Sequence, residues 1–245
     1  MNSATGIQVI SRAAQILREL KTDNSGQSLG ELATQTGLPR STVQRIVNAL
    51  IVEGFVTTSG KDGDLRLGPE VQALAAAGRV DITVMMRPWL EQLAEETGET
   101  VDLARFDGTH MTFVDQVAGR NRLSAVSVPG LQFPLVNTAN GKAVLALLPK
   151  EEVNRLCAIN TPGKERNALL EELRETRTSG LALDLDDHTP GISAAGIAFR
   201  TVGGEVFAVS IPAPSERFIK KRKAITQALE SFRTAAIAST PYFLA

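Results

Sequence analysis

Apolar residues recur at intervals of three and four over much of residues 9–53, which is the spacing of a buried helix face. Ser28, with Glu31 three positions later, has the pattern of a capping box at the start of a second helix. Gly37 supplies its stop, and a third helix follows after a tight turn. A short helix, a glycine-containing turn and a further helix form a helix-turn-helix. The three predicted helices cover residues 9–21, 29–36 and 40–53.

The third predicted helix has two contrasting faces, and the centres of its apolar and polar sets lie about 160° apart at 100° per residue. Arginine suits guanine, glutamine and asparagine suit adenine, and serine suits either base edges or phosphates. This polar face contains no acidic residue before Glu53, whereas an ordinary solvated helix face, the alternative interpretation, mixes both signs. The apolar positions are Val43, Ile46, Val47 and Leu50, and the polar positions are Ser41, Gln44, Arg45 and Asn48.

Strand signals follow this helix. Residues 55–58 are aromatic and β-branched, a polar turn comes next, and residues 65–67 can return as a second strand. A hairpin in this place makes a winged helix-turn-helix. The wing carries Lys61 and Arg66, which are candidates for contacts with backbone phosphates or the minor groove, although acidic residues in the same turn weaken that assignment.

The spacing changes from helical to alternating near residue 100. Before it, a linker helix is predicted over residues 70–79, and Pro88 suits the first turn of the next helix. After it, Asp107-Gly108 is a strong hairpin signal. Meandering strands with helices packed on one side make an antiparallel α+β domain. The predicted strands cover residues 101–106, 111–117, 123–128, 181–183, 192–199 and 206–211, and the predicted helices cover 139–148, 151–158, 167–179 and 218–238.

Several segments resemble the IclR family of bacterial transcriptional regulators. The run LGELATQTGLPRSTVQRIVNALIVEGFV, followed by LRLGPEV, is similar to the DNA-binding domain of that family. The segments TGETV, NGKA and SGLALD extend the resemblance over nearly the whole chain. The resemblance implies a GAF-like second domain, which periodicity alone does not indicate. We therefore expect an α+β protein with a winged helix-turn-helix domain over residues 6–68, a helical linker over 69–86 and a GAF-like antiparallel-sheet effector domain over 87–245.

The resemblance also implies an effector pocket in the second domain, whose matching positions are Ala139, Asn140, Asp184, Ala194 and Ser210. Free amides at the helix opening near residues 137–142 favour an anionic group such as an organic carboxylate. Plain capping by Asn137 or Thr138 explains the same pattern equally well. Ala194 stands where many relatives have cysteine, and Pro212 stands where a hydroxyl is common. We therefore expect an effector other than the small keto acids of some relatives.

Composition and charge narrow the function classes. A net charge of −1 gives no overall basic footprint, so nucleic-acid binding depends on the local placement of charge. The single cysteine excludes a disulfide framework. No apolar run approaches the roughly 20 residues that cross a bilayer, and the first residues have no secretory-signal pattern. We expect a cytoplasmic protein that does not associate with membranes.

Catalytic signatures are missing from the sequence. Gly141-Lys142 fails the Walker pattern, because Val136 replaces its first glycine and Ala143 replaces serine or threonine. No GxGxxG or GxSxG segment occurs. We expect no enzymatic activity, no metal and no cofactor. A weak oxygen-rich metal site is the alternative to an exposed acidic turn at Asp184, Asp186, Asp187 and His188.

The sequence therefore predicts a ligand-responsive transcriptional regulator, whose helix over residues 40–53 enters the major groove and whose small organic acid effector changes operator binding. One winged module reads few base pairs, so we expect a homodimer on a near-palindromic double-stranded operator. The resemblance implies dimers formed mainly through the N-terminal part and leaves pairing into tetramers open. The alternative is a metabolite-binding protein or small-molecule enzyme with a protein-interacting N-terminal module. The candidate contacts of the helix with DNA are Arg40, Ser41, Thr42, Gln44, Arg45 and Asn48.

Overall fold

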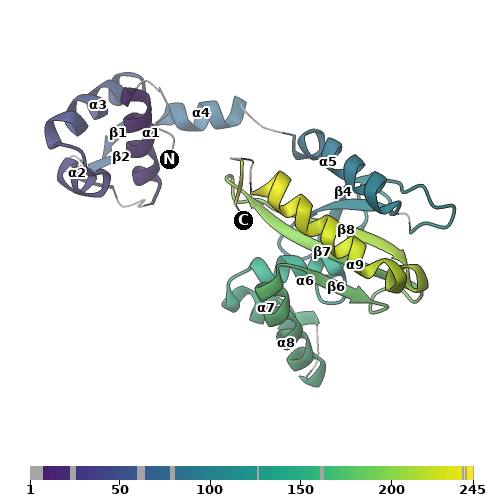
Figure 1. Cartoon of the computed structure of the whole chain (residues 1–245). Coiled ribbons are helices and arrows are strands. Elements are labelled where there is room, and N and C mark those ends of the chain that lie inside the picture. The colour runs from purple at the N-terminus through teal and green to yellow at the C-terminus, as the bar shows by residue number, and fades with distance from the viewer. Residues whose placement is uncertain are drawn as a thin grey trace. The chain divides into compact units, whose positions relative to one another are not determined.

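The chain divides into two compact units, Met1–Val80 and Asp81–Ala245. Figure 1 shows helices with a small hairpin in the first unit and a large sheet flanked by helices in the second. The computed structural model describes residues 8–22, 26–59, 64–77, 81–125, 127–160, 163–238, 240 and 242–244.

The first unit contains the predicted helix-turn-helix and hairpin. The capping box is confirmed: Ser28 Oγ accepts a hydrogen bond from the Glu31 amide at 3.3 Å, and the Glu31 carboxylate accepts one from the Ser28 amide at 2.8 Å. Gly37 ends the second helix with a φ of 66°, a left-handed conformation that favours glycine. The elements are α1 (Gln8–Thr22), α2 (Leu29–Thr36), α3 (Arg40–Val52), the antiparallel strands β1 (Val56–Ser59) and β2 (Asp64–Leu67), and α4 (Pro69–Ala77).

One hydrophobic cluster joins the three helices and the hairpin. The predicted apolar stripe of α3 lies at its centre, where Val43, Ile46 and Val47 are buried and Leu50 is half-buried. Because this face of α3 packs inward, the opposite face is left to solvent. The other buried members are Ile16, Leu20, Leu32, Val56 and Leu65.

The second unit opens with α5 (Ile82–Thr97), which begins earlier than predicted. The Asp81 carboxylate accepts hydrogen bonds from the amide and hydroxyl of Thr83 at 2.9 and 2.7 Å and so caps the helix. The prediction that Pro88 lies in the first turn is therefore wrong, because this proline lies inside the helix. The carbonyl that Pro88 leaves without a helical donor belongs to Val84, a residue on the exposed side.

A single antiparallel sheet forms the centre of the second unit. Its order is β5-β4-β3-β8-β7-β6, and β9 pairs with β7. Every strand pairing is antiparallel, as predicted. The strands are β3 (Val101–Phe106), β4 (Met111–Val117), β5 (Gln132–Phe133), β6 (Ala182–Leu185), β7 (Ile192–Thr201), β8 (Val206–Pro214) and β9 (Phe243–Leu244).

Helices cover both faces of this sheet (Figure 1), which corrects the prediction that they pack on one side. α5 and α9 (Ser215–Phe232) lie on one face. α6 (Ala139–Leu147) lies on the other face, where α7 (Lys150–Asn160) and α8 (Gly163–Ser179) pack with it. The run over residues 206–213, which is apolar except for Ser210, was the available signal, because a strand buried on both faces has no solvent-exposed polar side.

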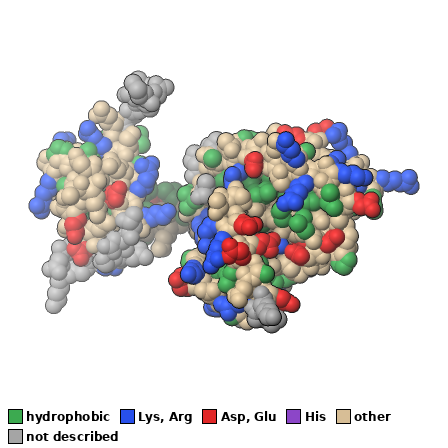
Figure 2. All heavy atoms as spheres, turned by 60° about the horizontal axis from the view of Figure 1, so that its bottom comes forward, with side chains coloured by type: hydrophobic (Ala, Val, Ile, Leu, Met, Phe, Trp, Pro, Cys, Tyr) green, Lys and Arg blue, Asp and Glu red, His purple; other side chains and the backbone are tan. Residues whose placement is uncertain are grey.

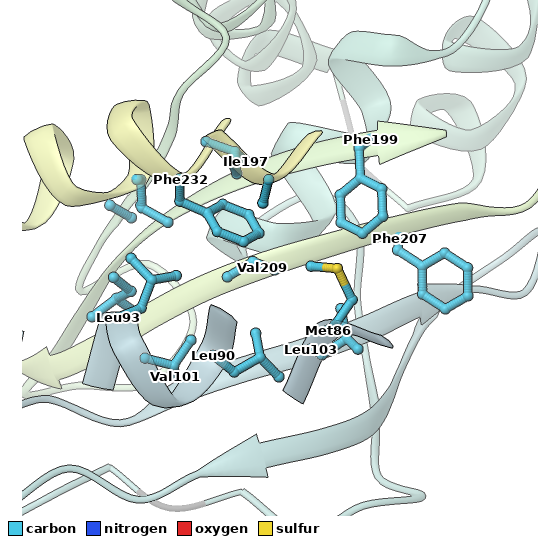
Figure 3. Packing of buried hydrophobic residues seen from close by; sticks show 14 of the residues in the cluster. Met86, Leu90, Leu93, Val101, Leu103, Ile197, Phe199, Phe207, Val209 and Phe232 are labelled. Carbon is cyan, nitrogen blue, oxygen red and sulfur yellow. The ribbon is translucent and has the colours of Figure 1, made fainter. Parts of the chain in front are cut away.

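Successive residues of the central strands point to opposite faces of the sheet. Leu103, Ile197 and Val209 face α5 and α9 and belong to the larger hydrophobic cluster (Figure 3). The strand neighbours Asp102 and Ser210 point to the side of α6, where they line a cavity. The sheet thus separates the larger apolar core from the cavity.

None of the described residues of the predicted strand 123–128 is in a strand; they form a bend and irregular backbone. Phe113 of β4 instead accepts a hydrogen bond from the Gly130 amide at 2.8 Å and donates one to the Leu131 carbonyl at 3.0 Å. The segment that pairs with β4 therefore begins after Pro129, and only the short β5 follows it.

The C-terminal helix, predicted over residues 218–238, is α9 followed by the π-helix η1 (Arg233–Ile237). Within the described ranges, none of the helices combines the length and the apolar character needed to span a membrane.

Candidate functional site

The polar face of α3 is open to solvent. The two arginines on it form no ion pair with any carboxylate in the part of the chain that the structure describes. Both guanidinium groups are therefore available to an external partner. The six candidate contacts are the exposed Arg40, Ser41, Gln44, Arg45 and Asn48 and the half-buried Thr42.

The N-terminus of α3 has no side-chain cap. Its N-cap residue is Pro39, whose carbonyl accepts hydrogen bonds from the amides of Thr42 and Val43 at 2.8 and 3.1 Å. No side chain satisfies the first amides of the helix, so this end presents backbone donors and the positive end of the helix dipole. Such an end favours phosphate groups.

An apolar groove borders this face. It has a volume of about 480 Å³ and lies between α1 and α3, where Thr42 and Arg45 line it together with Val9 and Phe55. Two of the six candidate contacts thus lie between the polar face and an apolar surface.

The wing residues are placed differently. Lys61 lies outside the described residues. Arg66 is half-buried, pairs across the hairpin with Thr57, and runs so close to Gly26 that a Cβ there would lie 3.1 Å from Arg66 Nε. Arg66 is therefore less accessible than the exposed residues of α3.

A cavity of about 210 Å³ lies on the α6 side of the large sheet. The predicted effector residues come from the N-terminus of α6, from β6 and from the two long strands β7 and β8, and the structure brings all of them to this cavity. The five are Ala139, Asn140, Asp184, Ala194 and Ser210.

The N-terminus of α6 is held tightly against the sheet. Thr138 Oγ1 accepts a hydrogen bond from the Gly141 amide at 3.1 Å and donates one to the Pro134 carbonyl at 2.7 Å, so the alternative of capping by Thr138 is observed. A Cβ on Gly141 would lie 2.5 Å from the backbone of Leu135, and one on Gly196 would lie 3.1 Å from that of Ala139. Glycine at these positions permits the close approach of α6 to its neighbours.

Asp102 is a cavity residue that sequence reasoning missed. It lies on β3 opposite Ser210 of β8, and it accepts a hydrogen bond from Gln116 Nε2 at 2.5 Å. Burial raises the pKa of its carboxyl to about 7, although the Gln116 hydrogen bond lowers it. Its sequence context gives no sign of this position, because an aspartate between the apolar Val101 and Leu103 is also the pattern of a strand residue that points to solvent.

Asp184 supplies a second carboxyl to the cavity. It accepts hydrogen bonds from the amides of Asp187 at 2.9 Å and His188 at 3.4 Å. Burial raises its pKa against the effect of these bonds and of the Lys142 charge. The Lys142 ammonium does not line the cavity, because it is buried in ion pairs with Glu172 at 2.7 Å and Asp187 at 2.9 Å.

Aromatic rings form another part of the cavity wall. Phe113 and Phe133 pack edge to face with their centroids 4.7 Å apart, and Phe133 packs similarly on His188 at 4.9 Å. All three line the cavity, together with Ser127 of the segment predicted as a strand. No lysine or arginine is among the described lining residues. The sequence alone gave no indication that these rings meet, because they come from separate segments.

The acidic turn over residues 184–188 directs its carboxylates to different partners. Asp187 pairs with Lys142, and Asp186 accepts a hydrogen bond from the Gly191 amide at 3.0 Å. Among the residues that the structure describes, no group of three or more histidine, cysteine or acidic side chains could hold a metal ion. The diverging hydrogen bonds favour the interpretation as a turn over that as a metal site.

Comparison with known proteins identifies a family. The sequence profile of the IclR helix-turn-helix domain matches residues 9–60, and that of the bacterial transcriptional regulator IclR C-terminal region matches residues 74–238, more than half of the chain. The HTH-type transcriptional regulator Rv1719 of Mycobacterium tuberculosis is 43% identical over 230 residues, covering 91% of this chain and 89% of that protein. The regulator TtgV of Pseudomonas putida is 38% identical over 234 residues, covering 94% and 90%.

Solved structures agree with this result. An IclR transcriptional regulator from Silicibacter sp. TM1040 matches with a TM-score of 0.66 at 25% identity, covering 91% of this chain and 92% of that one. An IclR-family regulator from Rhodococcus sp. matches with a TM-score of 0.62 at 25% identity, covering 96% and 95%. The predicted α+β fold, with a helix-turn-helix domain and an antiparallel-sheet domain, is confirmed. The chain therefore belongs to the IclR family of bacterial transcriptional regulators.

Proposed function

We propose that this regulator reads its operator with α3 and changes its DNA affinity when a small organic molecule occupies the cavity beside α6. The observation that carries the first part is the exposed face of α3, which offers to a duplex amide side chains and two arginines that form no ion pair with the described residues. The cavity, with five residues predicted from the family resemblance, supports the second part. A ligand of this cavity can act on DNA binding only through different affinities for two arrangements of the protein.

The DNA-binding part is tested by a gel shift of the full chain on the DNA upstream of its own gene. Arg45→Ala should weaken specific binding by about 1–3 kcal/mol if Arg45 contacts a base edge. Arg222→Ala, an exposed arginine on α9 in the other unit, is the matched control and should leave binding unchanged. Unchanged binding by Arg45→Ala and by a second variant, Gln44→Ala, would contradict the assignment of α3.

The charges around the cavity indicate the effector class. Two carboxyls with raised pKa values, those of Asp102 and Asp184, line the cavity, and no lysine or arginine is among its described lining residues. The carboxylate of an organic acid would therefore be repelled unless Asp102 and Asp184 are neutral. A flat, uncharged molecule with hydroxyl donors can pack on the aromatic wall, and its hydroxyl groups can bond to Asp102 and Asp184 whether these carboxyls are protonated or ionised. We infer this class in preference to the organic acid predicted from the helix opening.

A matched pair of probes separates the two classes. Benzyl alcohol should raise the melting temperature of the full chain at both pH 6 and pH 8. If benzoate enters this cavity, it should raise the melting temperature more at pH 6 than at pH 8, because the pKa of Asp102 is about 7 and protonation of this carboxyl removes the repulsion. A benzoate shift larger than that of benzyl alcohol at pH 8, abolished by Ser210→Val, would restore the organic acid as effector.

Exposed apolar side chains in the first unit support a homodimer formed through this unit. Val9 and Ile10 begin α1, Ile51 and Val52 end α3, and all four are exposed. Val9 and residues of the last turns of α3 line one groove, so the two ends lie together. We propose that a second copy covers this surface, with further pairing into tetramers left open. Sedimentation of Ile10→Asp and Val52→Asp should show monomers, and an unchanged dimer would refute this interface.

The relatives are transcriptional regulators, so we propose a regulatory and not a catalytic role for this chain. A protein that binds chromosomal operators acts in the cytoplasm of a bacterium, which is the location we propose. Turnover of a cavity ligand by the purified chain is the observation that would favour the alternative of an enzyme.

A further inference from the structure

A second cavity lies in the second unit and shares no lining residue with the cavity on the α6 side of the sheet. It has a volume of about 300 Å³ and is enclosed by α6, the end of α8, β7 and η1. Its apolar surface comes partly from three alanines, Ala143 and Ala146 of α6 and Ala198 of β7. Small side chains at these positions leave the space between helix and strand unfilled.

Two arginines line this cavity, and both are bonded to the ends of helices. Arg177 donates from Nε to the Ala146 carbonyl at 2.9 Å and from Nη2 to the Leu148 carbonyl at 3.3 Å. Arg233 donates from Nη1 to the Ser179 carbonyl at 3.0 Å. Each guanidinium carries five N–H donors, so donors remain on both after these bonds are made.

Neither guanidinium has an anionic partner in the described structure. No carboxylate lies within ion-pair distance of Arg177 or Arg233, and no aspartate or glutamate is among the described residues that line the cavity. Two positive charges thus border one apolar space without a counter-charge. The first cavity, of about 210 Å³, has the opposite character, because the acidic side chains Asp102 and Asp184 line it and no lysine or arginine is among its described lining residues.

The backbone around Arg233 is specialised. Arg233 is the first residue of the π-helix η1, and π-helical turns occur frequently at functional sites. Its Nη1 passes so close to Gly180 that a Cβ there would lie 1.7 Å away, and Gly180 has a φ of 73°. Only glycine at this position allows the guanidinium to lie where it does.

We propose that this second cavity binds a small organic carboxylate, held by the free donors of Arg177 and Arg233 with its apolar part against the three alanines. Planar guanidinium groups match carboxylates with paired hydrogen bonds. α6 and β7 contribute residues to both cavities, so a ligand in one can change the affinity of the other, and any such coupling is reciprocal.

Isothermal titration of the full chain with benzoate at pH 8 tests the proposal, with benzamide as the uncharged probe of the same shape. We expect saturable benzoate binding that weakens about tenfold or more in Arg233→Gln and Arg177→Gln, because each substitution removes a charge-assisted hydrogen bond. Arg222→Gln, which lines neither cavity, should bind as the unmodified chain does. Benzamide should bind at least about tenfold more weakly than benzoate.

Arg233→Gln is the decisive variant, because Arg177 also holds the end of α6 and its loss could unfold that region. Circular dichroism establishes that each variant is folded, and Arg233→Lys, which keeps the charge, should retain part of the affinity. The proposal is overturned if benzoate shows no saturable binding, if benzamide binds equally well, or if Arg233→Gln binds benzoate with unchanged affinity. The last result would place benzoate elsewhere in the chain.

Discussion

Replacing Asp102 by asparagine should stabilise the protein at alkaline pH and leave it nearly unchanged at acidic pH. The side chain is buried, and the asparagine Oδ1 can accept the Gln116 hydrogen bond that the carboxylate now accepts. The variant therefore removes the ionisable proton while keeping the shape and this hydrogen bond. The difference in unfolding free energy between variant and parent then reports one titration.

The magnitude follows from the pKa. The Asp102 carboxyl has a pKa of about 7 in the folded chain against an ordinary value of 3.8. At about 1.4 kcal/mol per unit, ionising it in the folded state costs about 4 kcal/mol more than in the unfolded state. Because the folded pKa is raised, the parent is most stable when Asp102 is protonated and loses this stability as the pH rises from about 4 to about 7. The advantage of the variant should grow over that interval to about 4 kcal/mol at pH 8.

Urea unfolding of the full chain between pH 5 and pH 8 measures this difference. Trp89, the single tryptophan, packs edge to face on Phe232 with ring centroids 6.4 Å apart and so reports the second unit by its fluorescence. Asp107→Asn is the control, because the stability of this variant relative to the parent should change with pH in the opposite direction. Partial burial raises the pKa of Asp107, but hydrogen bonds from His110 and Thr109 lower it more, so this pKa lies below its ordinary value. A difference between Asp102→Asn and the parent that does not vary with pH would refute the reasoning.

Three further substitutions test the contacts around the sheet by the melting temperature. Gly141→Ala should destabilise the second unit by about 1–3 kcal/mol, because its methyl would lie 2.5 Å from backbone atoms. Glu99→Gln should cost about 3–5 kcal/mol, because it leaves the Arg217 guanidinium without the buried carboxylate that accepts its two 2.7 Å hydrogen bonds. The control is Glu95→Gln, at an exposed residue, which should change stability by less than about 1 kcal/mol. Equal losses in the two variants would contradict this account. Lys142→Met should lower the stability less than Glu99→Gln does, since the two carboxylates that it leaves unpaired are partly exposed and can be hydrated. A larger loss of stability than in Glu99→Gln would contradict this reasoning.

Local rules in the sequence predicted the first unit nearly residue by residue. The capping box at Ser28, the left-handed stop at Gly37 and the apolar stripe of α3 each depend on residues within a few positions of one another. The hairpin at Asp107-Gly108 is local in the same sense, and the structure has β3 and β4 joined there. Such features can be predicted from the sequence because they do not depend on contacts with distant segments.

The cavity was predictable only in part, because it depends on contacts between distant segments. Asp102 is a polar residue in an alternating strand, a pattern typical of a side chain that points to solvent, yet α6 covers that face. The segment over residues 123–128 alternates as a strand does, but the sheet edge next to β4 is taken by residues that follow Pro129. The prediction also missed that helices cover both faces of the sheet, because this too depends on contacts between distant segments. The five cavity residues predicted correctly to lie together came from the family resemblance, which carries the tertiary information that periodicity lacks.

The separation of core and cavity by the sheet has an evolutionary consequence. Along β8, the alternate residues Phe207, Val209, Ile211 and Ala213 belong to the larger hydrophobic cluster, whereas Ser210 and Pro212 between them line the cavity. If the cavity binds the effector as proposed, mutations at Ala194, Ser210 or Pro212 can alter which molecule is recognised without disturbing the layer beneath α5 and α9. Duplicated genes of this architecture can diverge toward new signals while inheriting an intact scaffold.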